Sequence, residues 1–159
     1  MDMIRLKTSG FTLIELIIVI ILLAIVSAYA ASRYIGQDSF AAFVAQEQVI
    51  SVIRQVQVNR MQSNVEALSG NTNFTLAIQS DCIGSQNACA LRSETRSDWV
   101  SMNGLTFSAS PALNLVEFDL LGNPTGLTGT SIDIAIQSVS EQCIVTINAQ
   151  GYVSQGGCS

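Results

Sequence analysis

A single carboxylate, Glu15, lies near the start of an apolar run over residues 11–31 that is otherwise uncharged. An ionised group inside a membrane-length apolar segment is costly, and it is usually paired with a partner of opposite charge. The nearest possible cation is the α-amino group that a cut after Gly10 would create on Phe11. Glu15 would then be the fifth residue of the shortened chain, and its carboxylate could pair with the Phe11 ammonium of a neighbouring subunit. We therefore predict a cleavage site between Gly10 and Phe11 and an assembly role for Glu15.

The chain contains four cysteines, and all of them follow the apolar run: Cys82, Cys89, Cys143 and Cys158. An even number of cysteines is typical of disulfides in an oxidising compartment, and four cysteines allow three connectivities. We favour the pairs Cys82–Cys89 and Cys143–Cys158, because each closes a short loop that contains glycine. A zinc site is the weaker alternative, since the chain has no histidine and no C-x-x-C pair.

Residues suited to catalysis are few. Without histidine, the candidates are carboxylates such as Glu117, Asp119 and Asp133, and these alternate with apolar residues in strand-like segments. Such alternation is typical of the solvent-facing side of a sheet. No glycine-rich phosphate loop and no Ser or Cys nucleophile motif is present. We predict that the protein is not an enzyme and requires no cofactor.

The apolar run itself predicts a transmembrane helix. Its 21 residues would form a helix about 30 Å long, which matches the hydrocarbon core of a bilayer. Arg5 and Lys7 precede the run, so the positive-inside rule places the N-terminus in the cytoplasm and the rest of the chain outside. A buried core helix would need a larger protein around it. A cleaved secretory signal would be unusually long, with only a passable cleavage site at residues 27–30.

The N-terminal sequence GFTLIEL, residues 10–16, resembles the class III leader junction of type IV prepilins and type II secretion pseudopilins. The resemblance implies that a prepilin peptidase removes a leader of residues 1–10 and N-methylates Phe11. It also implies an inner-membrane anchor over residues 11–31 and, as partners, major and minor pilin subunits and an inner-membrane assembly platform. The final location would be an extracellular pilus or a periplasmic pseudopilus.

Composition is compatible with a membrane-anchored extracellular domain. A cut after Gly10 would leave five basic and eleven acidic residues. No basic stripe is present, which argues against nucleic-acid binding as the main task.

Residues 32–69 contain no proline and one glycine, which predicts that the helix continues beyond the membrane. Its apolar residues fall on two faces at helical spacing. A helix with two apolar faces could pack on its own domain and against other copies, whereas the alternative is a helix sunk deep in its domain. The first face comprises Ala42, Ala45, Val49, Val52, Ile53 and Val56, and the second comprises Phe40, Phe43, Ile50, Val58, Met61, Val65 and Leu68.

Residues 70–159 predict a β-rich head. Apolar residues alternate with polar ones over residues 73–79, 115–120, 132–136 and 143–147, with a short final run at 151–154, and residues 122–126 and 156–157 have turn composition. We expect an antiparallel sheet laid against the helix. The predicted class is therefore α+β, with a long N-terminal helix packed on an antiparallel head that holds two disulfides.

The head is similar to the GspH/FimT group of minor pilins and pseudopilins in its Phe118-Asp119, its turn at residues 122–124 and its closing run at 151–153. Within this group it resembles the minor pilins of mannose-sensitive haemagglutinin (MSHA) type pili. Ser32 stands where many pilins have a kinking proline and Ala24 where the family often has glycine, and both favour unbroken helix. The resemblance implies a structural subunit of a surface-attachment pilus, and the C-terminal cysteine loop favours this reading. The alternatives are a secretion pseudopilin, or an adhesin head with loops 83–88 and 95–103 and Trp99 as its contact surface.

Overall fold

The computed structural model describes residues 11–38, 40–64, 71–127 and 129–159. The leader at residues 1–10, including Gly10, lies outside the described residues. The same holds for Val65 and Leu68 on the second helix face. The chain divides into two compact units, Met1–Gln37 and Asp38–Ser159, which we describe separately.

The first unit contains the helix α1 (Leu13–Asp38). Its segment Leu13–Ala31 is, by length and composition, able to cross a membrane. The side chains of residues 11–31 are exposed, so the apolar surface of this segment is not buried within its own unit.

The second unit begins with the helix α2 (Ala41–Met61). The expectation of one unbroken helix over residues 32–69 differs from the structure, because Phe40 takes a non-helical conformation at the N-cap and α2 ends at Met61. Gly36 and Asp38 have low helix propensity, which favours the end of α1 at Asp38. At the other end, the N–H and the hydroxyl of Ser63 both donate to the carbonyl of Arg60, at 3.1 and 2.7 Å, and close the last turn.

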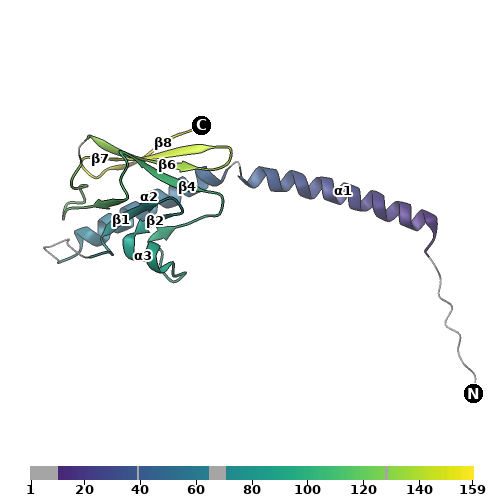
Figure 1. The fold of residues 1–159 in the computed structure, drawn as a ribbon, viewed down its shortest axis with the longest axis horizontal. Helices are drawn as coiled ribbons and strands as arrows, with labels where there is room; N and C mark the ends of the chain where they lie inside the picture. Colours follow the sequence, from purple (N-terminus) through teal and green to yellow (C-terminus); the bar gives the residue numbers. More distant parts are fainter. Residues whose placement is uncertain (1–10, 39, 65–70, 128) are drawn as a thin grey trace, which may run out of the picture. The chain divides into compact units, whose positions relative to one another are not determined.

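The head contains two four-stranded antiparallel sheets in place of the single sheet that we expected. The first sheet has the order β3-β2-β1-β5 and the second β4-β6-β7-β8. The strands of the first are β1 (Thr75–Gln79), β2 (Cys82–Ser85), β3 (Trp99–Val100) and β5 (Leu115–Glu117), and those of the second are β4 (Thr106–Ser110), β6 (Ser131–Gln137), β7 (Gln142–Asn148) and β8 (Val153–Cys158). A short helix, α3 (Gln86–Leu91), follows β2. Figure 1 shows α2 running along both sheets, and the predicted α+β class is confirmed.

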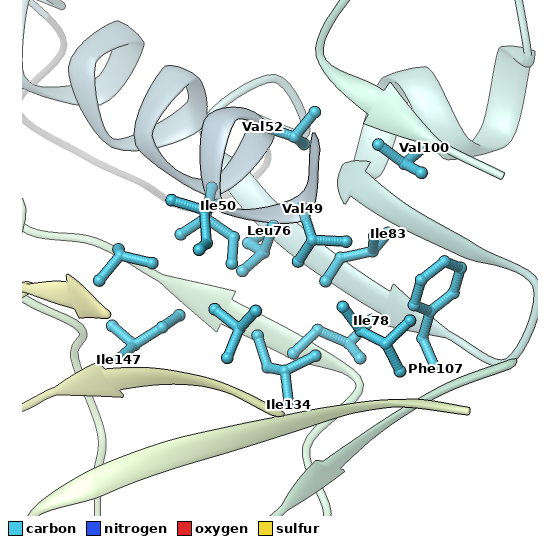
Figure 2. Packing of buried hydrophobic residues seen from close by; sticks show 14 of the residues in the cluster. Val49, Ile50, Val52, Leu76, Ile78, Ile83, Val100, Phe107, Ile134 and Ile147 are labelled. Carbon is cyan, nitrogen blue, oxygen red and sulfur yellow. The ribbon is translucent and has the colours of Figure 1, made fainter. Parts of the chain in front are cut away.

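The core lies between α2 and the inner faces of the two sheets. Figure 2 shows Val49 and Ile50 of α2 facing Leu76 of β1, while Ile134 and Ile147 extend from the second sheet. The first helix face is buried as expected. On the second face Phe40, Phe43, Val58 and Met61 are exposed, but Ile50 is only 5% exposed and belongs to the core. Ile50 was therefore placed on the wrong face.

Candidate functional site

The N-terminal motif begins with a capped helix. The backbone N–H of Glu15 donates to the side-chain oxygen of Thr12 at 3.3 Å and to the carbonyl of Thr12 at 3.1 Å. Thr12 therefore acts as the N-cap of α1, and Glu15 lies in the first turn, where a negative charge interacts favourably with the helix dipole. Our sequence reasoning missed Thr12, although the spacing Thr-x-x-Glu is the known capping-box pattern.

Phe11 precedes the helix and is 84% exposed, and the Glu15 side chain is exposed as well. The Glu15 carboxylate lies on an otherwise apolar helix surface, and it forms no ion pair within the described part of the chain. This arrangement can accept a cation from another chain. Cleavage after Gly10, methylation of Phe11 and pairing of Glu15 with a neighbour stay predictions.

The four cysteines form two disulfides, Cys82–Cys89 with a Cα–Cα distance of 5.9 Å and Cys143–Cys158 with 4.1 Å. These are the two pairs that we favoured from the sequence, because each closes a short loop. The first bond ties the start of β2 to α3, and the second ties β7 to the last residue of β8. Because all four sulfurs are bonded to one another in pairs, they are not available as zinc ligands.

Three polar side chains on the buried face of α2 hold the C-terminal part of the head. The Gln46 amide donates to the carbonyls of Ile144 and Gly156 at 2.7 and 3.1 Å. Gln57 donates to the carbonyls of Gly122 and Gly151 at 3.0 and 2.8 Å. Arg60 donates through Nε to the carbonyl of Phe118 at 3.1 Å. Sequence reasoning missed all three, because nothing local shows that a polar residue on a helix will meet a distant carbonyl.

These contacts bring together the residues on which the resemblance of the head to the GspH/FimT group is based. The turn after Phe118 and the turn at Gly151 meet at Gln57, and both glycines have positive φ, +83° at Gly122 and +77° at Gly151. A Cβ at Gly151 would collide with the carbonyl oxygen of Gly122. The residues of this motif, 118–124 and 151–153, therefore form the contact between two turns and the C-terminal part of α2.

The candidate catalytic carboxylates do not converge on a reactive site. Asp119 closes its own turn by accepting hydrogen bonds from the N–H groups of Leu121 and Asn123, both at 2.8 Å. Burial raises the pKa of Asp119, but hydrogen bonds from Asn123, Leu121 and Gly122 outweigh this effect and hold the pKa below its usual value. Glu117 and Asp133 are exposed residues of strands.

Of the two loops proposed as an adhesin surface, residues 83–88 are largely internal, whereas residues 95–103 include exposed positions at 95, 97, 101 and 103. Residues 83–88 are not a loop, since they form most of β2 and the start of α3, and Ile83, Ser85 and Ala88 are buried. Trp99 begins β3, packs against the cluster around Cys82–Cys89, and donates through its indole N–H to the carbonyl of Ser93 at 3.1 Å. Trp99 is thus half-buried and has a packing role.

An ion pair fixes the loop before β3. Arg96 donates to both carboxylate oxygens of Asp98, at 2.9 and 2.6 Å, and the Ser85 hydroxyl donates to Asp98 at 2.5 Å. Asp98 is 5% exposed. Burial raises its pKa, but the hydrogen bonds from Arg96 and Ser85 and the charge of Arg96 outweigh burial, so the pKa of Asp98 is lowered.

Replacing Asp98 with asparagine is expected to lower the free energy of unfolding of the head by about 1–3 kcal/mol at pH 7, because Arg96 and Ser85 lose a charged acceptor. A carboxyl with a lowered pKa in the folded state binds fewer protons there than in the unfolded state. Its stabilisation is therefore complete above the unfolded pKa and is lost as the pH falls through the folded one, below about pH 4. Urea unfolding followed by Trp99 fluorescence should show the difference between the two proteins shrinking from pH 7 to pH 3.

Asp81 provides the matched control. It forms an ion pair of the same length with Arg92, 2.6 Å, but both side chains are about half exposed, at 57% and 47%. An exposed pair contributes little to stability, so Asp81→Asn should leave the unfolding curve unchanged. Equal losses for the two variants would contradict a special role for Asp98.

Comparison with known proteins gives two findings. Residues 5–31 match the family model described as the prokaryotic N-terminal methylation motif. The fold is similar to that of the type IV minor pilin FimU of Pseudomonas aeruginosa, with a TM-score of 0.50 and 12% identity over 73% of this chain and 88% of that chain. A second crystal form of FimU gives a TM-score of 0.48 and 12% identity over 72% and 91% of the two chains.

Among proteins with curated functions, none matches this sequence. The methylation motif covers the N-terminal segment, and the likeness to FimU concerns the fold. The chain therefore combines a prokaryotic N-terminal methylation motif with a pilin-like α+β fold.

Proposed function

We propose that the protein is a structural subunit, a minor pilin, of a type IV pilus. The observation that carries this proposal is the order of its parts: a methylation motif over residues 5–31 leads into an exposed, membrane-length apolar helix, which is followed by a head with the pilin fold. Such a chain can be held in a membrane by α1 and later packed through the same helix against other copies. No catalytic arrangement competes with this role among the described residues.

The roles of the motif residues follow from this proposal. Prepilin peptidase cuts between Gly10 and Phe11 and methylates the new N-terminus. The chain then stays in the inner membrane, with the N-terminus at the cytoplasmic side, until the assembly platform transfers it into an extracellular filament. Glu15, in the first turn of α1, pairs there with the Phe11 ammonium of a neighbouring major or minor pilin.

Two features favour a pilus over a secretion pseudopilus. The disulfide Cys143–Cys158 closes a loop at the C-terminal end of the head, as the resemblance to pilins implies. The structurally similar FimU is described as a type IV minor pilin. The head motif of residues 118–124 and 151–153 further favours an MSHA-type pilus used for surface attachment, with a subunit like the minor pilin MshC. The second candidate, a GspH-like pseudopilin, rests on the same head motif.

Intact-mass analysis of sheared surface filaments should find this chain beginning at Phe11 and carrying one N-terminal methyl group. Gly10→Val should instead leave a full-length precursor in the inner membrane, because the peptidase requires a residue without bulk before the cut. A mature chain beginning near residue 31 would show a secretory signal. Recovery only from the periplasm, together with a secretin, would identify a pseudopilin.

A further inference from the structure

A pocket of about 300 Å³ lies beside β3, at the outer edge of the first sheet. This volume is at the lower end of the range for small-molecule sites. The walls come from three parts of the head: the helix α2, the loop before β3 (residues 93–98), and β3 with the residue that follows it. The lining residues are Gln48, Glu94, Arg96, Trp99, Val100 and Ser101.

Trp99 gives the pocket an apolar surface. The side chain is half-buried and packs against the disulfide between β2 and α3. Its indole N–H donates to the carbonyl of Ser93 at 3.1 Å, so the ring lies beside the loop that also carries Glu94 and Arg96. The part of Trp99 that lines the pocket is therefore rigid, and a ligand can pack on it with little loss of side-chain entropy.

Side-chain donors and acceptors without a partner line the same pocket. Arg96 donates to Asp98 through Nε and Nη2, and its Nη1 forms no hydrogen bond within the described part of the chain. The carboxylate of Glu94 and the amide of Gln48 are exposed and form none among the described residues. Glu94 therefore offers acceptors, Arg96 offers donors, and Gln48 offers both.

The edge of β3 adds a backbone donor and a backbone acceptor. β3 pairs only with β2, and the N–H of Ser85 donates to the carbonyl of Asp98 at 2.9 Å. Alternate residues of a strand present their backbone groups to the same edge, so the N–H and C=O of Trp99 point away from β2. Neither group forms a backbone hydrogen bond with another described residue.

The loop before β3 is held in place before any ligand binds. The ion pair between Arg96 and Asp98 is tied to β2 by the hydroxyl of Ser85. At a second point, Gln55 of α2 donates to the hydroxyl of Ser97 at 3.1 Å. A site that is ordered in advance loses less entropy when a ligand binds.

We propose that this pocket binds a neutral saccharide. The charges of Glu94 and Arg96 are opposite, so a ligand of either net charge meets one group of its own sign. A saccharide hydroxyl both donates and accepts hydrogen bonds, which matches the mixture of free groups, and the C–H face of a pyranose ring matches the indole of Trp99. The pocket uses none of the residues assigned to cleavage or assembly, so this binding activity goes beyond the role of a filament subunit.

The test uses the full chain in micelles of dodecylphosphocholine, a detergent without a sugar head group, and cellotriose as the probe. Trp99 is the only tryptophan of the chain, so tryptophan fluorescence reports on this pocket. Cellotriose should produce a saturable change in the emission of Trp99, and titration calorimetry should give the same dissociation constant. The absence of a saturable signal in both measurements would overturn the proposal.

Two further ligands separate a saccharide from other occupants. Sorbitol carries hydroxyls but has no rigid ring, and it should bind at least about tenfold more weakly than cellotriose. Acetyl-lysine-amide, which represents a basic side chain, meets the charge of Arg96 and should also bind at least about tenfold more weakly. Equal binding of acetyl-lysine-amide would assign the pocket to a basic segment of a partner protein, and equal binding of sorbitol would show that no ring is recognised. Either result would contradict the proposal.

A pair of variants tests the site. Glu94→Ala should weaken cellotriose binding by about tenfold or more, because the saccharide loses a charged acceptor. Glu117→Ala removes an exposed carboxylate that does not line this pocket, and it should change binding by less than about twofold. Gln48→Leu should weaken binding by about threefold or more. Equal binding by all three variants would contradict the site. Filament assembly does not enter these measurements, so a negative result here leaves the pilus proposal intact.

Discussion

Replacing Glu15 with valine is expected to abolish incorporation of the protein into filaments while leader cleavage and membrane insertion remain intact. Membrane insertion should not be impaired. Placing an acidic side chain at the centre of a membrane-spanning helix costs roughly 2.5–3.5 kcal/mol, and valine removes that cost. Incorporation fails because the Phe11 ammonium of a neighbour would enter an apolar helix bundle without a partner, and an uncompensated buried charge costs about 3–5 kcal/mol. Immunoblots of membrane and sheared-filament fractions measure cleavage and incorporation side by side.

The outcomes of this experiment separate three roles for Glu15. Glu15→Asp keeps the charge with a shorter reach and should give an intermediate amount of incorporation. Glu94→Val, which removes an exposed carboxylate from the head, is the matched control and should be incorporated normally. Uncleaved Glu15→Val precursor would indicate recognition by the peptidase, and normal incorporation of Glu15→Val would contradict the pairing.

The cap on α1 offers another explanation that must be separated from pairing. Glu15 is the third helical residue after the Thr12 cap, and its N–H bonds to Thr12. Losing such a cap costs a helix about 1 kcal/mol. Thr12→Ala removes the cap and keeps the carboxylate, so it should be incorporated close to normally. Failure of Thr12→Ala would assign the effect to the helix start instead of to the charge.

The parts of the fold that could be predicted are those in which one local pattern decides the outcome. The alternation of Ile132, Ile134 and Ile136 with polar residues gives β6 as expected, and all three are buried. The apolar run gives α1 because its length and uniform composition leave few other structures. Short loop length also favoured the disulfide pairing found in the structure.

The parts that could not be predicted depend on contacts between distant segments. β2 and α3 are four and six residues long, too short to show a period, and they are held by a disulfide and by the bond from Ser85 to Asp98. Ile50 lies near the edge of the predicted face, and only the position of the sheets decides that it is buried. The candidate site divides in the same way: the motif around Glu15 is visible in the sequence, whereas the hydrogen bonds of Gln57 and Arg60 depend on which segments become neighbours.

Gln46 illustrates this dependence most strongly, because its role follows from an irregularity in two strands about 100 residues away. The pairing of β7 with β8 shifts its register between Cys143 and Val145. Gly156 lies beside this irregularity, and a Cβ there would be 2.8 Å from the carbonyl oxygen of Ile144. The Gln46 side chain, which is fully buried, donates to the carbonyls of Ile144 and Gly156 and accepts from the Gln155 amide at 2.8 Å.

Replacing Gln46 with leucine should therefore lower the free energy of unfolding of the head by about 2–5 kcal/mol. Leucine has a similar size, so the loss comes mainly from two carbonyls left without a donor, at about 1–3 kcal/mol each. Gln46→Glu should also destabilise at neutral pH, because it keeps the shape but replaces the donor with a buried negative charge. Gln48→Leu, an exposed glutamine of the same helix, is the matched control and should lie within about 0.5 kcal/mol of the unmodified chain. Urea unfolding of the full chain in detergent, followed by the fluorescence of Trp99, measures all three variants. A Gln46→Leu protein as stable as Gln48→Leu would show that β8 is held only by the Cys143–Cys158 disulfide and by its backbone pairing with β7.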